Sequence, residues 1–111
     1  TNDAINEIRY FHNDGIEFVV ISLGEEGSIV GFNNKIYKVT VPKVNAINPV
    51  GSGDSYVAGV AIGLARNYNI NDVLKLASAC GTANAMEKET GSVRKEIVDE
   101  LIDKIRIEVL E

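Results

Sequence analysis

The sequence predicts an α/β layered domain, because strand-like and helical segments follow one another along a short chain. A β-branched apolar run over residues 17–22 has the length of a buried strand. Two further strand-like runs flank Asn33-Asn34, and the second half of the chain has the apolar spacing of helices. With 45% hydrophobic residues among 111, the chain can form one small globular domain with its own core.

Start and stop signals delimit most of these elements. Asn2 or Asp3 is a candidate cap for the first helix, and Gly15 ends it. Pro42 ends the third strand, and Asn71 is expected to cap the second-last helix. The expected elements are a helix over 3–14, strands over 17–22, 28–32 and 35–41, and helices over about 53–67, 72–88 and 94–108.

The last predicted helix, residues 94–108, is amphipathic, and Gly91 closes the helix before it. Its apolar residues share one face: Ile97, Val98, Leu101, Ile102 and Ile105.

The order of elements indicates part of a larger fold. One strand flanked by helices, with a hairpin at the sheet edge, rarely forms a complete doubly wound sheet. Thr1 already lies at a helix start, with no segment before it. We therefore expect residues 1–111 to be a C-terminal piece, truncated at the N-terminus, that exposes apolar surface and favours self-association.

Composition narrows the classes of function. The net charge of −5 argues against broad affinity for nucleic acid or an anionic membrane. No apolar run approaches the roughly 18 residues that span a bilayer, and no secretory signal is visible. Cys80 is the only cysteine, so an internal disulfide is excluded and a cytoplasmic location is expected.

The most informative stretch is the loop NPVGSGDS over residues 48–55, which runs directly into an apolar helix of small residues. Glycines let backbone N–H groups converge, and a helix N-terminus adds partial positive charge, so the loop is a candidate anion site. Asp54 would repel a bound phosphate unless it has a catalytic or metal-binding role. This conflict favours phosphoryl-transfer chemistry, with Asp54 as the base.

The alternative interpretation is a tight turn in which Asp54 is an ordinary helix N-cap. Other phosphate and hydrolase motifs do not fit the stretch. No lysine follows the glycines and the spacing is not G-x-G-x-x-G, so neither a Walker P-loop nor a dinucleotide fingerprint is present. A G-x-S-x-G nucleophile elbow is also missing from the sequence.

Residues 48–54 resemble the C-terminal signature of the ribokinase-like (PfkB) sugar kinases, a D/N-T/P-x-G-A/S-G-D loop that opens a helix. The resemblance implies the C-terminal part of a ribokinase-like three-layer α/β/α fold. It also implies that Asp54 takes the proton from the acceptor hydroxyl. The anion hole for the transferred phosphate would be formed by the backbone amides of Gly51, Ser52 and Gly53.

A second turn, SLGEEG over residues 22–27, resembles the family's T/S-L-G-x-x-G turn, which lies against the nucleotide. Its alternative is a plain β-turn between two strands. The resemblance implies ATP contacts in this turn, in the glycine loop and in the helix over 72–88. The expected ATP-binding residues are Ser22, Leu23, Gly24, Glu25, Glu26, Gly27, Gly53 and Ser78.

The segment over residues 78–91 indicates the subgroup. Asn84 and the Glu87-Lys88…Thr90-Gly91 pattern resemble tagatose-6-phosphate kinases more than ribokinases, with 1-phosphofructokinases as the competing subgroup. Many family members have an asparagine near the adenine where Ser78 stands here. Glu87, Lys88 and their neighbours therefore favour a ketohexose phosphate as the sugar substrate.

The resemblance implies that Mg-ATP and a sugar phosphate are the ligands of the complete protein. No His/Cys/Asp cluster has metal-ligand spacing, so Mg²⁺ is expected to arrive with ATP rather than bind to this chain. The chain by itself is expected to be inactive. A candidate of another class is a non-catalytic module that binds a nucleotide or a partner.

Overall fold

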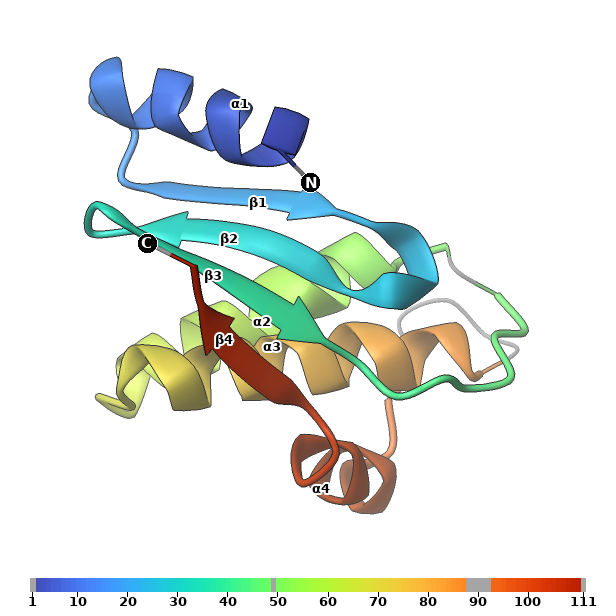
Figure 1. Ribbon diagram of the computed structural model, residues 1–111. Coiled ribbons are helices and arrows are strands. Elements are labelled where there is room, and N and C mark those ends of the chain that lie inside the picture. The colour runs from blue at the N-terminus through green and yellow to red at the C-terminus, as the bar shows by residue number, and fades with distance from the viewer. Residues whose placement is uncertain (1, 49, 88–92, 111) are drawn as a thin grey trace. The chain divides into compact units, whose positions relative to one another are not determined.

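The computed structural model describes residues 2–48, 50–87 and 93–110, which form two compact units. The first unit comprises Thr1–Thr40 and Ile107–Glu111, and the second comprises Val41–Arg106; each is described by itself. The elements, labelled in Figure 1, are α1 (Asn2–Asn13), β1 (Phe18–Ser22), the 3₁₀ turn η1 (Gly24–Glu26), β2 (Ser28–Phe32), β3 (Lys35–Thr40), α2 (Ser52–Ala65), α3 (Ile70–Ala85), α4 (Lys95–Ile102) and β4 (Arg106–Val109).

The first unit is built on a four-stranded sheet in the order β1-β2-β3-β4 (Figure 1). β1 with β2 and β2 with β3 are antiparallel pairs. Phe32 pairs with Lys35, so the hairpin loop has two residues, Asn33 and Asn34, with φ of 55° and 63°. Asparagine tolerates this left-handed backbone better than most residues, which confirms the predicted hairpin.

Helix α1 packs against β1 and β2 through an apolar core (Figure 1). Ile8 and Ile29 are fully buried there. A Cβ at Gly31 of β2 would overlap Ile8 Cγ2 and lie 2.8 Å from the His12 ring. The missing side chain on β2 therefore makes the space into which α1 fits.

The prediction of a single helix over residues 94–108 was wrong. Helix α4 ends at Ile102, and Arg106–Val109 form β4 next to β3 in the sheet. Just beyond it, the Leu110 amide donates a hydrogen bond to the Ile36 carbonyl at 2.7 Å. The edge of β3 offers hydrogen-bond partners to the backbone of residues 106–109. The last turn of a longer α4 would leave its carbonyl groups without partners in the protein, so the segment pairs with the sheet although its apolar spacing is helical.

The predicted cap of α3 was also misplaced by two residues. Asn69, not Asn71, is the N-cap, and its side-chain oxygen accepts a hydrogen bond of 2.9 Å from the Asp72 amide. Asn69 has the extended backbone that a cap requires, with φ of −67° and ψ of 164°, whereas Asn71 is already helical. The described helix ends at Ala85.

Part of the prediction for this region lies outside the described residues. Lys88 was the expected end of the helix, and Gly91 was expected to close it. Thr90, in the pattern used to indicate the subgroup, lies in the same segment.

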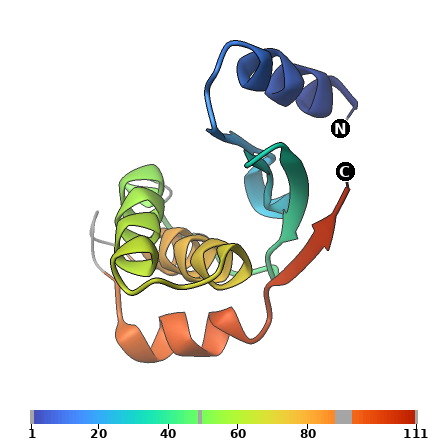
Figure 2. The same ribbon diagram turned by 90° about the vertical axis from the view of Figure 1, so that its left-hand side faces the viewer.

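The second unit is a layer of helices in which α2 and α3 lie side by side and α4 packs against α3 (Figure 2). Gly59 and Gly63 of α2 face Ala77 and Val73 of α3 at close range. The small residues let the two helix backbones approach, so the loop before α2 lies next to the last turn of α3. In the described part of the chain, no helix has the length and apolar character that crossing a membrane requires.

Candidate functional site

The glycine loop forms the N-terminus of α2, a helix of 14 residues. Gly51 is the N-cap, with φ of 86° and ψ of −4°, and no side chain caps the helix. This left-handed conformation disfavours any residue with a Cβ, so Gly51 is required by the turn itself. The interpretation of Asp54 as the N-cap was therefore wrong, because Asp54 lies inside the first turn.

The first amides of α2 remain available to a ligand. The Ser55 amide donates to the Gly51 carbonyl at 3.0 Å, which is the first hydrogen bond of the helix. Among the described residues, the amides of Gly51, Ser52 and Gly53 donate to no other group. Unpaired amides at a helix N-terminus attract anions, so this loop has the chemistry of a phosphate cradle.

Asp54 is exposed on the first turn of the same helix, while the next residue, Ser55, is buried. An exposed carboxylate can be reached by a substrate hydroxyl and can accept its proton. Placed beside donors that hold negative charge, such a carboxylate has the chemistry of a general base for transfer to an alcohol.

Residues at the end of α3 form hydrogen bonds with the glycine loop and with the segment that leads into it. Asn84 is fully buried, and its side-chain amide donates to the Val50 carbonyl at 2.9 Å and to Ser52 Oγ at 3.4 Å. The Ala85 carbonyl accepts hydrogen bonds from the amides of Ile47 and Asn48, at 2.7 and 2.9 Å.

Sequence reasoning gave Asn84 only a subgroup resemblance and no structural role. Its signal was a polar amide inside a helix of small apolar residues. Pro49, within the loop, lies outside the described residues.

The turn over residues 22–27 belongs to the first unit and is a 3₁₀ turn between β1 and β2. The Leu23 amide donates to the Gly27 carbonyl at 2.9 Å, and the Gly24 amide donates to Ser22 Oγ at 3.2 Å. Glu25 and Glu26 are exposed. Gly27 has φ of 108°, and a Cβ there would overlap the Val39 carbonyl oxygen, so the hairpin geometry by itself requires this glycine.

Ser78, the residue expected near adenine, is buried in α3. Its hydroxyl has no hydrogen-bond partner among the described residues. Burying a hydroxyl without a hydrogen-bond partner costs folding free energy. The Ser78 hydroxyl is therefore a candidate for a hydrogen bond with a polar atom of a ligand.

Two other groups in the second unit are perturbed by burial. Burial raises the pKa of Tyr56 to about 12, and the Tyr56 hydroxyl finds no partner among the described residues. Burial also raises the pKa of the Cys80 thiol, which keeps the sulfur protonated and a poor nucleophile. Covalent catalysis by Cys80 is therefore disfavoured.

The structure also bears on metal binding. Within residues 2–48, 50–87 and 93–110, no three His, Cys, Asp or Glu side chains are grouped so that they could hold a metal ion. The loop amides that lack a partner among the described residues fit phosphate oxygens rather than a cation, because N–H groups are donors.

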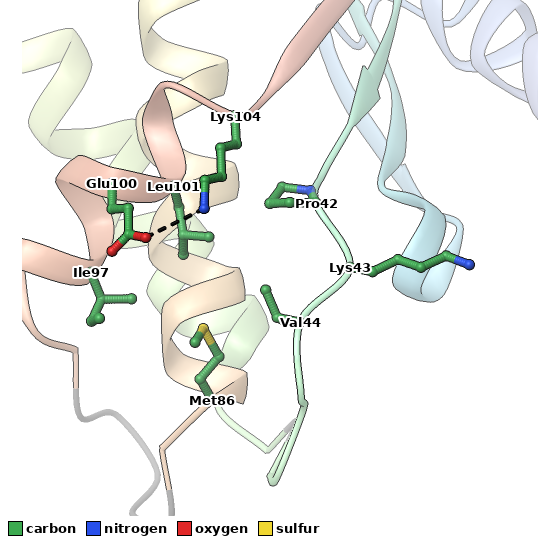
Figure 3. Close-up of a pocket in the computed structure, with 8 residues that line it drawn as sticks. All are labelled: Pro42, Lys43, Val44, Met86, Ile97, Glu100, Leu101 and Lys104. Atoms are coloured by element: carbon green, nitrogen blue, oxygen red, sulfur yellow. Dashed lines mark hydrogen bonds and ion pairs between the residues drawn. The ribbon is translucent and has the colours of Figure 1, made fainter.

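A cavity of about 110 Å³ in the second unit lies apart from these residues (Figure 3). Val44, Met86 and Leu101 line it with apolar surface, and the Lys104 ammonium pairs with Glu100 at 3.3 Å on its rim. Small-molecule sites usually enclose about 300–1,000 Å³, so this cavity is too small for a nucleotide. None of the expected site residues lines it.

Comparisons with known proteins identify the family of this chain. A family model described as pfkB family carbohydrate kinase matches residues 1–96. A tagatose-6-phosphate kinase from Staphylococcus epidermidis is 45% identical over 92 residues, which are 83% of this chain and 30% of that protein. The chain thus spans less than a third of the length of that curated relative.

Solved structures support the fold. A Staphylococcus aureus protein assigned as a phosphofructokinase matches with a TM-score of 0.91 at 32% identity, over 99% of this chain and 35% of its own. Phosphofructokinase-2 from Escherichia coli, solved with potassium, matches with a TM-score of 0.83 at 24% identity, over 92% of this chain and 33% of its own. The first of these likenesses, together with the fold of the second, confirms the predicted ribokinase-like α/β class.

Proposed function

Since the chain belongs to the pfkB carbohydrate kinase family, we propose that it is the part of a sugar-phosphate kinase that carries the catalytic base and much of the ATP site. The observation that carries the proposal is an exposed carboxylate, Asp54, on the same helix N-terminus as loop amides that have no partner among the described residues. The chain covers 30% of the length of the Staphylococcus epidermidis tagatose-6-phosphate kinase, so the proposed activity is that of the complete protein to which this chain belongs.

The loop amides act on the phosphate that is transferred. The N–H groups of Gly51, Ser52 and Gly53 donate to its oxygens and offset the negative charge that gathers there as the bond to the leaving oxygen breaks. The dipole of α2 adds positive potential at the same end of the helix. These donors are fixed before the substrate arrives, so little reorganisation is needed during the reaction.

Asp54 acts on the acceptor. Its carboxylate accepts the proton of the sugar hydroxyl as the oxygen attacks the phosphorus, and the products are a bisphosphate and ADP. Base catalysis of this kind contributes about 10²–10⁴-fold to the rate. Carboxylate and phosphate repel one another. A sugar hydroxyl placed between them keeps the two negative charges apart, donates its proton to the carboxylate and attacks the phosphorus with its oxygen.

The proposed nucleotide contacts are given for each unit by itself. In the first unit, the turn over residues 22–27 contributes its backbone and the side chain of Ser22. In the second unit, Gly53 lies by the phosphates and Ser78 by the base. ATP is the donor that the family membership supports, and Mg²⁺ is expected to accompany its phosphates.

The proposed acceptor is tagatose 6-phosphate. The 45% identity to a tagatose-6-phosphate kinase supports this choice over fructose 1-phosphate, which remains the second candidate. The rival from another class is a module that binds a nucleotide without catalysis. It shares the anion site but gives no purpose to the exposed carboxylate beside it.

The deciding experiment compares two isosteric substitutions in the protein expressed from its complete reading frame. Asp54→Asn removes the base, and Asp72→Asn makes the same change at an exposed aspartate in the first turn of α3. ADP release is measured against a panel of ketohexose phosphates. We expect Asp54→Asn to lower kcat by about 10²–10⁴-fold and Asp72→Asn to leave it near wild type.

Each result has a defined reading. Wild-type protein that binds ATP but phosphorylates no sugar supports the non-catalytic module. Near-normal turnover by Asp54→Asn removes Asp54 from the mechanism. Preferred turnover of fructose 1-phosphate would retain the kinase and reassign its substrate.

A further inference from the structure

Asn84 stands out among the polar side chains of the second unit. It has no exposed surface, it lies in the last turn of α3, and its amide reaches across to the loop that precedes α2. A buried amide is retained only where its donors and acceptors are satisfied, since a buried polar group without a partner is costly. Two hydrogen-bond acceptors of this amide, the Val50 carbonyl and Ser52 Oγ, lie in the glycine loop.

We propose that Asn84 is a positioning residue that aims the amides of the glycine loop at the transferred phosphate; the inference rests on the function proposed above. The Val50 carbonyl and the Gly51 N–H belong to one peptide unit, which is planar and trans, so they point in opposite directions. By holding the Val50 carbonyl at 2.9 Å, Asn84 turns the Gly51 N–H away from its own side chain.

Neighbouring contacts fix the rest of the loop. The Ala85 carbonyl accepts from Ile47 and Asn48, so the segment that enters the loop is tied to the same turn of α3. The Asn48 side-chain oxygen accepts the Val50 amide at 3.0 Å. The exit is held by the weaker contact of 3.4 Å from Asn84 to Ser52 Oγ.

A second reason for this arrangement is the electrostatics of α3. The last carbonyls of a helix lack donors within the helix, and their partial negative charge would repel a phosphate. Here the Ala85 carbonyl is engaged by two loop amides, and the Asn84 amide covers the Val50 carbonyl. The Ala85 carbonyl at the end of α3 and the Val50 carbonyl of the loop are therefore both covered by donors, which reduces their repulsion of a phosphate.

The test replaces Asn84 by two apolar residues of different volume in the protein expressed from its complete reading frame. Asn84→Leu fills the space without a donor, and Asn84→Ala leaves a cavity without a donor. We expect both to lower kcat by about 10–100-fold with the KM for ATP changed less than about threefold, because misplaced donors weaken mainly the transition state.

The control is Val73→Ala, which removes a buried side chain from the opposite end of α3 and lowers stability without touching the loop. Kinetics are compared at temperatures where all the variants are folded. Amide hydrogen exchange of Ile47, Asn48 and Val50 is measured in parallel. It should accelerate at least tenfold more in the Asn84 variants than in Val73→Ala.

The outcomes separate this inference from the proposed function. If kcat and the exchange of the three loop amides match those of Val73→Ala, Asn84 is only a packing residue and the inference is overturned. If the wild-type protein phosphorylates no sugar, the proposed function fails. The exchange rates, together with the shifts that inorganic phosphate induces in the Gly51 amide resonance, then still decide whether Asn84 aims the loop.

Discussion

A Cβ atom at Gly59 of α2 would lie 2.7 Å from the Ala77 Cα of α3, so the backbones of the two helices meet at this point. The contact sets how closely the helices pack behind the glycine loop. Gly53 of the same helix differs from Gly59, because a Cβ at Gly53 would meet no atom within 4 Å.

Gly59→Ala should therefore destabilise the protein, although alanine favours a helix by about 1 kcal/mol over glycine. Overpacking at the Ala77 backbone is expected to cost about 1–3 kcal/mol, because backbone atoms cannot move aside as a flexible side chain does. Gly53→Ala is the matched control for stability and should be neutral or stabilising. Urea unfolding of the two variants measures the difference, and equal stabilities would contradict the close packing of α2 on α3.

Asn69→Ala should lower the unfolding free energy by about 1 kcal/mol, since it removes the acceptor for the Asp72 amide at the start of α3. Asn71→Ala, two residues later and equally polar, should change stability by less than about 0.5 kcal/mol. Thermal unfolding of both variants decides which asparagine is the cap. A larger effect at Asn71 would contradict the observed helix start.

Tyr56→Phe should change how stability depends on alkaline pH. Burial raises the pKa of the folded-state phenol from 10.0 to about 12, so between these values the unfolded chain loses this proton first. The phenol thus contributes a loss of stability as pH rises through that window, and no change below it. Unfolding at pH 9 to 12 should show a shallower decline in Tyr56→Phe than in the wild type.

The control for that measurement is Tyr10→Phe, at an exposed tyrosine. At neutral pH, Tyr56→Phe should be close to neutral in stability, because the Tyr56 hydroxyl has no partner among the described residues. A large loss at neutral pH would mean that the hydroxyl has a partner after all.

Ser78→Ala should separate stability from nucleotide binding. Without ligand, the variant should be as stable as the wild type or slightly more so, because it removes a buried hydroxyl that lacks a partner in the described chain. If the hydroxyl receives a hydrogen bond from ATP, the Kd for ATP should rise by about fivefold, as expected for one lost hydrogen bond of about 1 kcal/mol. Calorimetric titration of both proteins measures this, and an unchanged Kd would remove Ser78 from the proposed site.

Local signals in the sequence were sufficient for several features. Asn33 and Asn34 predicted the hairpin, because a two-residue loop needs residues that tolerate positive φ. Gly51 and its neighbours located the start of α2 within one residue, since glycine spacing and the apolar helix that follows are both properties of adjacent residues. The α/β class followed from the same short-range patterns.

Tertiary structure decided what depends on residues distant in the sequence. Residues 106–109 became a strand because the edge of β3 offered backbone partners. Asn84 became part of the candidate site because α2 packs closely enough on α3 for its amide to reach Val50, 34 residues away. Composition and spacing determine which local conformations are favourable, whereas the free energy of pairing and burial between distant segments selects among them.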